Sequence, residues 1–271
     1  MTPRSIAWVE GHWGEPQQLQ LPLSDRGLTL ADGLFETVLV LDGRPRLLRA
    51  HLQRWQHSAE LLAMAPPPEA SALQPLIEEA IRRAELPEGS GALRLNWSRG
   101  DSGGRGIELP APATPHRFWL QLSPHRPSFS PQTAIVSRQE RRNSHSLLSR
   151  CKTFAYGQAI QARLEARRAG ADEALLLSSG GELCCGTTAN LLIQRQGQWL
   201  TPKLGSGCLP GVMRAQLLER GLAEETDLSP KPQPGDAWLL INSLGCRPLS
   251  RVDEHPLELH PNAEALWRSL L

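Results

Sequence analysis

The sequence predicts an α+β fold in two domains. Predicted helices and strands are mixed, without the regular strand–helix–strand rhythm of a parallel Rossmann sheet. A stretch rich in proline and glycine runs from Gly100 to Pro131 and is typical of loops around a short strand at residues 118–122. The chain has 271 residues, which suits one large domain or two of medium size. We therefore expect a first domain over residues 1–115 and a second over residues 124–271.

Hydrophobic periodicity places the elements of the first domain. Residues 35–41 are apolar and rich in β-formers, and the Asp42-Gly43 pair that follows predicts a hairpin turn. Apolar residues then recur at spacings of three and four from Leu48 to Leu62, which marks one face of a helix. A second helix is expected at residues 76–84 and a further strand at residues 92–98.

The second domain alternates between short strands and helices. Strands are expected at residues 134–136, 174–177, 191–193, 199–200 and 237–241. Helices are expected at residues 153–169, 212–223 and 261–271. Gly170 would end the first of these helices, and Pro210-Gly211 would lead into the second.

Composition narrows the functional classes. The formal net charge is +1, from 29 basic and 28 acidic residues, which gives no reason to expect nucleic acid or an anionic membrane as partner. The N-terminus resembles no signal peptide, and no run approaches the ~18 apolar residues of a membrane span. The five cysteines form no C-x-x-C pair, which favours reduced thiols in a cytoplasmic protein and no metal site.

Lysine is scarce, and one lysine stands apart. The chain has 26 arginines but only three lysines, Lys152, Lys203 and Lys231. Lys203 and Lys231 lie beside prolines in polar segments, whereas Lys152 is expected to open an amphipathic helix. A lysine amine can be deprotonated and can bind an aldehyde cofactor covalently, which arginine cannot do. A surface lysine is the alternative interpretation.

Two segments suit the binding of a phosphate. The turn before residue 212 would deliver the chain into a helix whose first amide groups, at Val212 and Met213, are free to bind an anion. Arg54, within His51-Leu52-Gln53-Arg54, is a fixed cation that could hold a phosphate through two bonds. Considered separately, each segment also fits an ordinary capped helix or a solvated charge.

A glycine-rich loop carries two further arginines. Arg99 and Arg105 flank Gly-Asp-Ser-Gly-Gly after the strand at residues 92–98. Glycine lets the backbone approach a ligand closely, and arginine suits carboxylates. We expect these two arginines to bind substrate carboxylates, with a flexible surface loop as the alternative.

Several motifs occur in one order along the chain. They are Asp25-Arg26-Gly27, Ala31-Asp32-Gly33-Leu34-Phe35-Glu36-Thr37, His51-Leu52-Gln53-Arg54, Lys152, Thr188-Ala189-Asn190-Leu191 and Leu209-Pro210-Gly211-Val212-Met213-Arg214. In this order they resemble class IV (fold type IV) pyridoxal 5′-phosphate (PLP) enzymes, which include branched-chain and D-amino acid aminotransferases and aminodeoxychorismate lyase. The resemblance covers nearly the whole chain. It implies PLP as cofactor, the two-domain α+β fold of branched-chain aminotransferases, a homodimer, and a site at the domain junction.

The resemblance also implies which residues form the site. Lys152 would be the catalytic residue that binds PLP. The expected cofactor-binding set is Lys152, Arg54, Tyr156, Cys185, Thr188, Val212, Met213, Ser243 and Leu244. Tyr156 would lie one helical turn beyond Lys152 on the same face and bond the phenolate oxygen of the cofactor; a tyrosine that packs at a helix end is equally expected.

One position departs from the family pattern. The family places a glutamate, which keeps the pyridine nitrogen protonated, five residues before the asparagine that matches Asn190. Here that position is Cys185, and the nearby Glu182 should face the other side of an extended strand. A cysteine is a weaker partner for a pyridinium, which disfavours transamination. The Cys184-Cys185 pair could also be two small buried hydrophobes.

Within the family, three segments resemble aminodeoxychorismate lyases. They are the loop from Arg99 to Gly106, the Cys184-Cys185 pair, and Asn242-Ser243-Leu244 with Arg247-Pro248. We therefore expect a lyase that converts 4-amino-4-deoxychorismate, a small molecule, to 4-aminobenzoate and pyruvate in folate precursor synthesis. Two alternatives remain: a class IV aminotransferase for branched-chain or D-amino acids, and a PLP-binding protein without catalysis.

Overall fold

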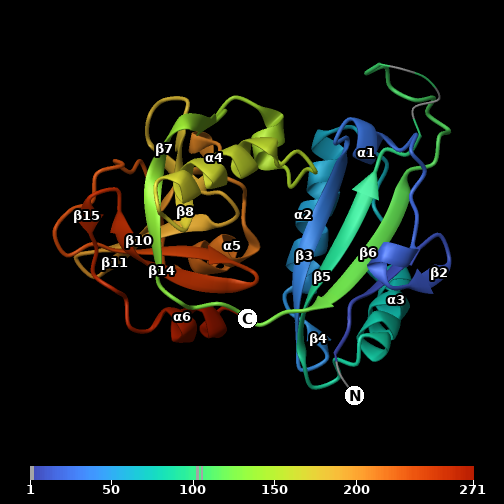
Figure 1. Ribbon diagram of the computed structural model, residues 1–271, viewed down its shortest axis with the longest axis horizontal. Helices are drawn as coiled ribbons and strands as arrows, with labels where there is room; N and C mark the ends of the chain where they lie inside the picture. Colours follow the sequence, from blue (N-terminus) through green and yellow to red (C-terminus); the bar gives the residue numbers. More distant parts are fainter. Residues whose placement is uncertain (1–2, 102–103, 105) are drawn as a thin grey trace. The chain divides into compact units, whose positions relative to one another are not determined.

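The computed structural model describes residues 3–101, 104 and 106–271, and the chain folds into two compact units (Figure 1). The first unit runs to Arg126 and also includes Lys152–Ala155, and the second comprises Pro127–Cys151 and Tyr156–Leu271. The first unit extends beyond residue 115 because strand β6 (Arg117–Pro124) pairs with strands on both of its sides. The mixture of helices and strands confirms the expected α+β class.

The first unit is built on an antiparallel sheet. Among the described residues the strand order is β2-β1-β6-β5-β3-β4. The strands are β1 (Ile6–Val9), β2 (His12–Gly14), β3 (Gly33–Leu41), β4 (Arg44–Pro45), β5 (Ser90–Ser98) and β6. The helices are η1 (Pro16–Gln18), α1 (Arg26–Thr29), α2 (Leu48–Leu61) and α3 (Ala70–Arg83). Helix α2 packs against β3, and α3 packs against β1 and β6, so both bury an apolar face on the sheet.

The second unit holds a mixed sheet. Its strand order is β12-β11-β10-β13-β14-β7-β8-β9 among the described residues, with β15 paired to β14. The strands are β7 (Gln132–Arg142), β8 (Glu173–Ser178), β9 (Leu183–Gly186), β10 (Asn190–Arg195), β11 (Gln198–Pro202), β12 (Glu224–Thr226), β13 (Ala237–Asn242), β14 (Gly245–Val252) and β15 (His255–Pro256). The helices are η2 (Leu147–Arg150), α4 (Gly157–Arg168), η3 (Leu204–Ser206), α5 (Val212–Glu219) and α6 (Ala263–Ser269). Helix α4 packs on β7 and β8, and these two strands pair in parallel.

The segment around Lys152 differs from the sequence prediction. The helix expected from residue 153 begins only at Gly157, and Lys152 lies in an extended segment that pairs with the start of β3. The amide of Phe35 donates to the carbonyl of Lys152 at 2.9 Å, and the amide of Phe154 donates to the carbonyl of Gly33 at 3.0 Å. The pairing depends on Gly33, because a Cβ there would lie 2.2 Å from the Phe154 ring. The prediction that Lys152 opens a helix is therefore wrong.

Two other elements are longer than predicted. Helix α3 begins at Ala70 instead of residue 76, and buried Leu73 and Ile77 extend its apolar face across Pro75. Strand β7 continues to Arg142 although its second half is polar, because it pairs with β8. None of the described helices is long and apolar enough to cross a membrane.

Candidate active site

In the first unit, two cations lie against one aromatic ring. The Nζ atom of Lys152 is 4.4 Å from the centre of the Phe35 ring, and the guanidinium carbon of Arg94 is 3.5 Å from the same centre. Phe35 is buried, while Lys152 and Arg94 are half-buried. A cation over an aromatic face is attracted by the ring, so Phe35 helps to fix both side chains near each other.

Arg54 is held by a buried carboxylate. Its Nε and Nη2 atoms donate to the two carboxylate oxygens of Glu36, at 2.8 and 2.5 Å. The Nδ1 atom of His51, one turn earlier on α2, lies 2.7 Å from Oε2 of Glu36. Such a two-pronged pair fixes the plane of the guanidinium as well as its position. Glu36 therefore orients the cation predicted to bind the phosphate.

The protonation states of this cluster follow from burial and charge. Burial alone would raise the pKa of Glu36, but the charge of Arg54 and the hydrogen bond with His51 outweigh it and lower the pKa to about 2. Burial lowers the pKa of His51, and the charges of Arg54 and Lys152 lower it further against the opposing pull of Glu36. His51 is thus neutral at pH 7, and its Nδ1 carries the proton that it donates to the carboxylate.

A cavity of about 210 Å³ lies in the same unit. Its lining consists of Leu21, Gly27, Leu28, Arg94, Asn96, Trp119 and Phe154. Its walls are mostly apolar, and Arg94 is the cation among them. Phe154, two residues after Lys152, forms one wall, so the cavity lies beside the segment that carries the predicted catalytic amine.

The two arginines predicted for substrate carboxylates have different outcomes. Each guanidinium nitrogen of Arg99 donates to a protein acceptor: Nε to Asp32, Nη1 to the carbonyl of Ala63 and Nη2 to that of Leu62. These contacts favour a structural role for Arg99 over the predicted carboxylate binding. Arg105 lies outside the described residues, so its role stays a prediction.

In the second unit, the start of α5 presents backbone amides as expected. Gly211 is the N-cap of α5, and the amides of Val212 and Met213 in the first turn have no acceptor within the helix. Asn190 donates from Nδ2 to the carbonyl of Leu209 at 2.9 Å, which ties the start of β10 to the turn before α5. A Cβ on Gly211 would lie 1.9 Å from the Oδ1 atom of Asn190, so only glycine fits this turn.

The two neighbouring cysteines lie in an apolar cluster. Cys184, Cys185 and Cys208 pack with alanines of α4 and with Leu176. The hydrogen bond with Cys184, together with burial, raises the pKa of the Cys185 thiol well above its usual value. Cys185 is therefore a neutral thiol, which can donate a weak hydrogen bond but cannot balance the charge of a pyridinium.

The remaining predicted cofactor residues occupy turns of the second unit. Thr188 is exposed, and Ser243 is half-buried. The amide of Leu244 donates to Oδ1 of Asn242 at 2.8 Å, so it already has an acceptor within the turn, and its predicted role in cofactor binding stays a prediction. Tyr156 is the N-cap of α4. Because Lys152 is not part of that helix, the argument that both side chains share one helical face fails.

Sequence reasoning missed two residues of the site, Glu36 and Arg94. Glu36 is the one charged residue of the largely apolar strand β3, and Arg94 is the one charged residue of strand β5. A charge within an apolar strand is a signal for a buried partner or a ligand, since an unpaired buried charge is costly. That signal was available in the sequence.

The described residues fit PLP in most respects. The cofactor needs an amine, cations or amides for its phosphate, and a partner for its ring nitrogen. In the first unit Lys152 supplies the amine and Arg54 a fixed cation. In the second unit the first turn of α5 presents the backbone amides of Val212 and Met213, which have no acceptor within the helix. Cys185 is the one poor match among these described residues. Its neutral thiol could pair with an unprotonated ring nitrogen but could not balance the charge of a protonated one.

Three comparisons relate the chain to known proteins. A sequence model described as amino-transferase class IV matches residues 33–252. The chain is 25% identical to the aminodeoxychorismate lyase of Bacillus subtilis over 258 residues, which cover 92% of this chain and 87% of that protein. It is 27% identical over 245 residues to a bifunctional aminodeoxychorismate lyase and D-amino acid transaminase of Mycobacterium tuberculosis, with 82% and 80% of the two chains covered. A solved structure described as a hypothetical aminotransferase from Mycobacterium tuberculosis in its PLP-bound form matches with a TM-score of 0.83 at 24% identity, covering 98% of this chain and 97% of that one.

Proposed function

Because the chain belongs to the class IV aminotransferase family of PLP-dependent enzymes, we propose that it is a lyase that converts 4-amino-4-deoxychorismate to 4-aminobenzoate and pyruvate. Relatives that span most of the chain carry lyase names, and one of them also carries a transaminase name. The names of these relatives do not decide between the two reactions, so the choice of a lyase depends on the site of this chain.

The cavity of the first unit is that observation. It has apolar walls, Trp119 and Phe154 among them, and one cation, Arg94. This suits a flat ring that carries a carboxylate, since the ring packs on apolar walls and the guanidinium pairs with the acid. Its volume of about 210 Å³ is below the ~300–1,000 Å³ of drug-sized pockets, as a small ring acid requires.

The proposed roles of the side chains follow from their chemistry. The Nζ atom of Lys152, once released from the cofactor, would take the proton from the ring carbon that bears the substrate nitrogen and return it to the departing pyruvate. Arg94 would hold one carboxylate and Arg105 the other. Arg54, Ser243 and the amides of Val212 and Met213 would bind the cofactor phosphate.

The cofactor supplies electron acceptance when it is bound, which makes the proton on the carbon next to the substrate nitrogen acidic. A carboxylate beside the ring nitrogen would keep it protonated, and the neutral thiol of Cys185 would not. The bound cofactor would therefore accept electrons less strongly here than beside a carboxylate. Formation of an aromatic ring supplies a large driving force in the lyase reaction, so this reaction tolerates the weaker demand better than transamination does.

The test is product formation by the purified holoprotein. The substrate is generated in the same tube from chorismate and glutamine by an added synthase, and 4-aminobenzoate is measured by its fluorescence after separation. We expect the wild-type protein to form 4-aminobenzoate and Lys152→Ala to form none. Borohydride reduction followed by peptide mass spectrometry should place the reduced cofactor on Lys152.

A matched lysine variant controls for general effects. Lys203 is half-exposed and pairs with Asp227 at 2.5 Å, so Lys203→Ala should retain wild-type product formation. If the wild-type protein binds PLP through Lys152 yet forms no 4-aminobenzoate, the lyase proposal is wrong, and the choice is then between a transaminase and a binding protein without catalysis.

A D-amino acid transaminase is a second candidate, because one relative combines that activity with the lyase activity in its name. Mixing the holoprotein with D-alanine alone should then convert bound PLP to its amine form, which changes the visible absorbance. We expect little conversion, since Cys185 supplies no carboxylate for the ring nitrogen.

A homodimer is part of the proposal. Light scattering on the purified holoprotein measures its mass, and we expect twice the chain mass of 29.8 kDa. A monomer that is fully active would contradict this element of the proposal alone.

A further inference from the structure

The guanidinium group of Arg94 is held in one direction by two neighbours. Its Nε atom donates to Oδ1 of Asn96 at 2.7 Å, and its carbon lies 3.5 Å from the centre of the Phe35 ring. The group is planar and stacks on aromatic faces, so the ring fixes its plane and the hydrogen bond at Nε fixes its rotation within that plane. Arg94 therefore cannot turn without losing one of these contacts.

Asn96 is itself fixed by the sheet. Only 2% of the residue is exposed, and its Nδ2 atom donates to the carbonyl of Trp119 at 3.3 Å. Trp119 is the residue that pairs with Asn96 where β5 and β6 run side by side. A guanidinium group only donates hydrogen bonds, so the amide oxygen of Asn96 faces Arg94 and the amide nitrogen faces the backbone. The direction of the amide is thus defined at both ends.

Arg94, Asn96 and Trp119 all belong to the lining of the cavity in the first unit. Alternate residues of a strand face the same side of a sheet, so Arg94 and Asn96 share the face of β5 that borders the cavity. Leu93 and Leu95 alternate with them and are fully buried. A buried amide is costly without hydrogen-bond partners, and both partners of Asn96 border this cavity. The amide therefore connects the sheet to the cation of the lining.

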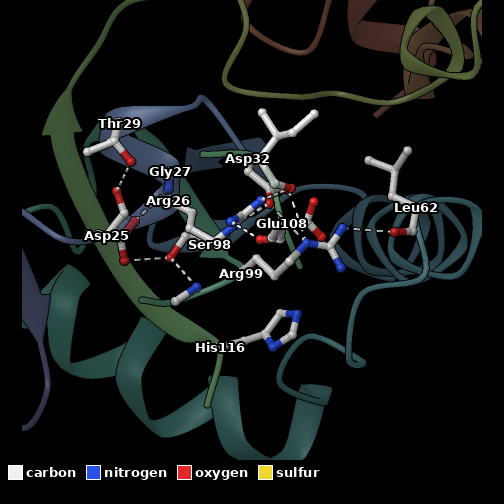
Figure 2. Close-up of polar contacts among 12 residues, drawn as sticks. Asp25, Arg26, Gly27, Thr29, Asp32, Leu62, Ser98, Arg99, Glu108 and His116 are labelled. Atoms are coloured by element: carbon white, nitrogen blue, oxygen red, sulfur yellow. Dashed lines mark hydrogen bonds and ion pairs between the residues drawn. The ribbon is translucent and has the colours of Figure 1, made fainter. Parts of the chain in front are cut away.

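Another part of the lining, at Gly27, is also fixed. The amide of Gly27 donates to Oδ1 of Asp25, and the Oγ atom of Ser98 donates to Oδ2 of the same buried carboxylate, each at 2.8 Å (Figure 2). A Cβ on Gly27 would lie 2.8 Å from the Phe154 ring, so the backbone there packs directly against that ring. Fixed walls at Gly27 and Arg94 suit a rigid, flat ligand, because such a ligand loses little freedom when it binds.

We propose that Asn96 is a positioning residue that aims Arg94 at a carboxylate on a flat ring in this cavity. This role rests on the proposed function, in which Arg94 holds one carboxylate of the substrate, and it adds the residue that orients the arginine. A guanidinium group that is already fixed can form two parallel bonds with a carboxylate and loses little side-chain freedom on binding. Without Asn96 the charge of Arg94 would remain, but its direction would not be fixed.

Benzoate and benzamide test this selection without catalysis. Both are flat rings of nearly the same size, only benzoate is charged, and neither carries an amine that would react with the aldehyde of PLP. Calorimetric titration of the holoprotein gives a dissociation constant for each. We expect the wild-type protein to bind benzoate at least about tenfold more tightly than benzamide, because a guanidinium group bonds a carboxylate more strongly than a neutral amide.

Two substitutions at position 96 separate the direction of Arg94 from its charge. Asn96→Leu has nearly the same volume but no acceptor, so the preference for benzoate over benzamide should fall to about threefold or less. Asn96→Asp keeps an acceptor for the Nε atom of Arg94 but adds a negative charge, which should abolish the preference. Asn96→Asp also keeps the test open if Asn96→Leu fails to fold.

Two controls separate this role from a general disturbance of the cavity. Benzamide should bind Asn96→Leu within about twofold of its wild-type affinity, because the substitution conserves volume. Gln121→Leu removes a similar amide from the residue that pairs with Arg94 in the sheet. Because the amide of Gln121 donates to Ser123 at 3.1 Å instead, the preference for benzoate should stay at the wild-type level in this variant.

Kinetics tests the role of Asn96 with the substrate. Asn96→Leu should raise the KM for 4-amino-4-deoxychorismate about tenfold and change kcat by less than about twofold, because the reacting amine of Lys152 is untouched. The proposal is overturned if the wild-type protein does not prefer benzoate, if either substitution at position 96 leaves the preference unchanged, or if Asn96→Leu lowers kcat while KM stays unchanged. If the wild-type protein forms no 4-aminobenzoate, the proposed function fails and the titrations still decide the role of Asn96.

Discussion

Buried carboxylates have different partners in the two units. In the first unit Glu36 and Asp25 pair with arginines whose side chains are only 10% and 12% exposed. In the second unit Glu173 and Asp236 pair with arginines that are 28% and 20% exposed. Glu173 also accepts backbone hydrogen bonds, from the amides of Ala174 and Thr187.

The difference separates two uses of a buried carboxylate. In the first unit Glu36 fixes a cation that has little access to water, so the cation keeps its direction and can hold an anionic ligand; Asp25 likewise fixes Arg117 and also caps α1 by accepting from the amide of Gly27. In the second unit the carboxylate orders a backbone turn, and its arginine can still be hydrated. Removing a partner should therefore cost more in the first unit, because it leaves a buried charge without compensation.

The largest effect is expected for Glu36→Gln. This variant leaves Arg54 beside a neutral amide in a buried place, and the loss of one partner of a buried ion pair typically costs about 3–5 kcal/mol. Urea unfolding of the holoprotein, followed by the fluorescence of its tryptophans, measures the loss. We also expect weaker PLP binding, since the guanidinium of Arg54 loses its fixed direction.

Glu79→Gln is the matched control for Glu36. The hydrogen bonds from Arg82 and Arg83 lower the pKa of Glu79 to about 2, as low as that of Glu36, but Glu79 lies at the surface of α3. We expect little change in its urea midpoint, since solvent hydrates the separated charges. Equal losses of unfolding free energy in Glu36→Gln and Glu79→Gln would show that burial does not decide the effect.

Glu36 should also make the stability of the fold depend on pH. Its contribution should be present above pH 4.5 and should be lost as the pH falls toward 2.

A smaller effect is expected for Glu173→Gln in the second unit. The side-chain oxygen in Glu173→Gln would still accept one of the hydrogen bonds from Thr187. The Arg163 side chain is exposed enough to be hydrated when it loses its ion pair. We expect a loss of about 1.5–3 kcal/mol in the free energy of unfolding, the value of one hydrogen bond to a charged group. A loss as large as that of Glu36→Gln would remove the distinction between the two units.

The sequence predicts much of the local structure and less of the pairing. Strand β3 and helix α2 were predicted within a few residues because their apolar spacing is regular and local. The extended segment at Lys152 was missed, because it is fixed by pairing with Gly33 and by the space that this glycine leaves for Phe154. Such contacts join distant segments and leave no periodic trace.

The candidate site divides in the same way. The helix start at Val212 could be predicted from a local turn. The partners of Arg99 could not, because they are backbone carbonyls at a helix end that any residue type provides. Glu36 could have been found as the partner of Arg54, since a charge within an apolar strand needs one.

His116 should make the stability of the first unit depend on pH in mild acid. The Nε2 atom of His116 accepts a hydrogen bond from the Ala65 amide at 3.2 Å, and burial followed by the charge of Arg99 lowers the pKa of His116. The unfolded chain therefore binds a proton at His116 more readily than the folded chain does. The contribution of His116 to the free energy of unfolding is fully present above pH 6.5 and is lost as the pH falls through the pKa that His116 has in the folded protein. His116→Gln keeps a hydrogen-bond acceptor for the Ala65 amide. It should make the urea midpoint less dependent on pH, by an amount that corresponds to at most one proton taken up on unfolding. An unchanged slope below pH 6.5 would mean that His116 titrates alike in both states.

The smallest effect is expected for Cys185 in the second unit. Its thiol packs among alanines of α4, so Cys185→Ala should cost only about 1 kcal/mol of stability. If the thiol also bonds the pyridine nitrogen of PLP, the visible absorbance of the lysine-bound cofactor should shift slightly in Cys185→Ala. Cys184→Ala is the control, because it removes a neighbouring thiol from the same cluster. Identical spectra in the two variants and the wild type would mean that Cys185 serves packing alone, and the ring nitrogen would then need another partner.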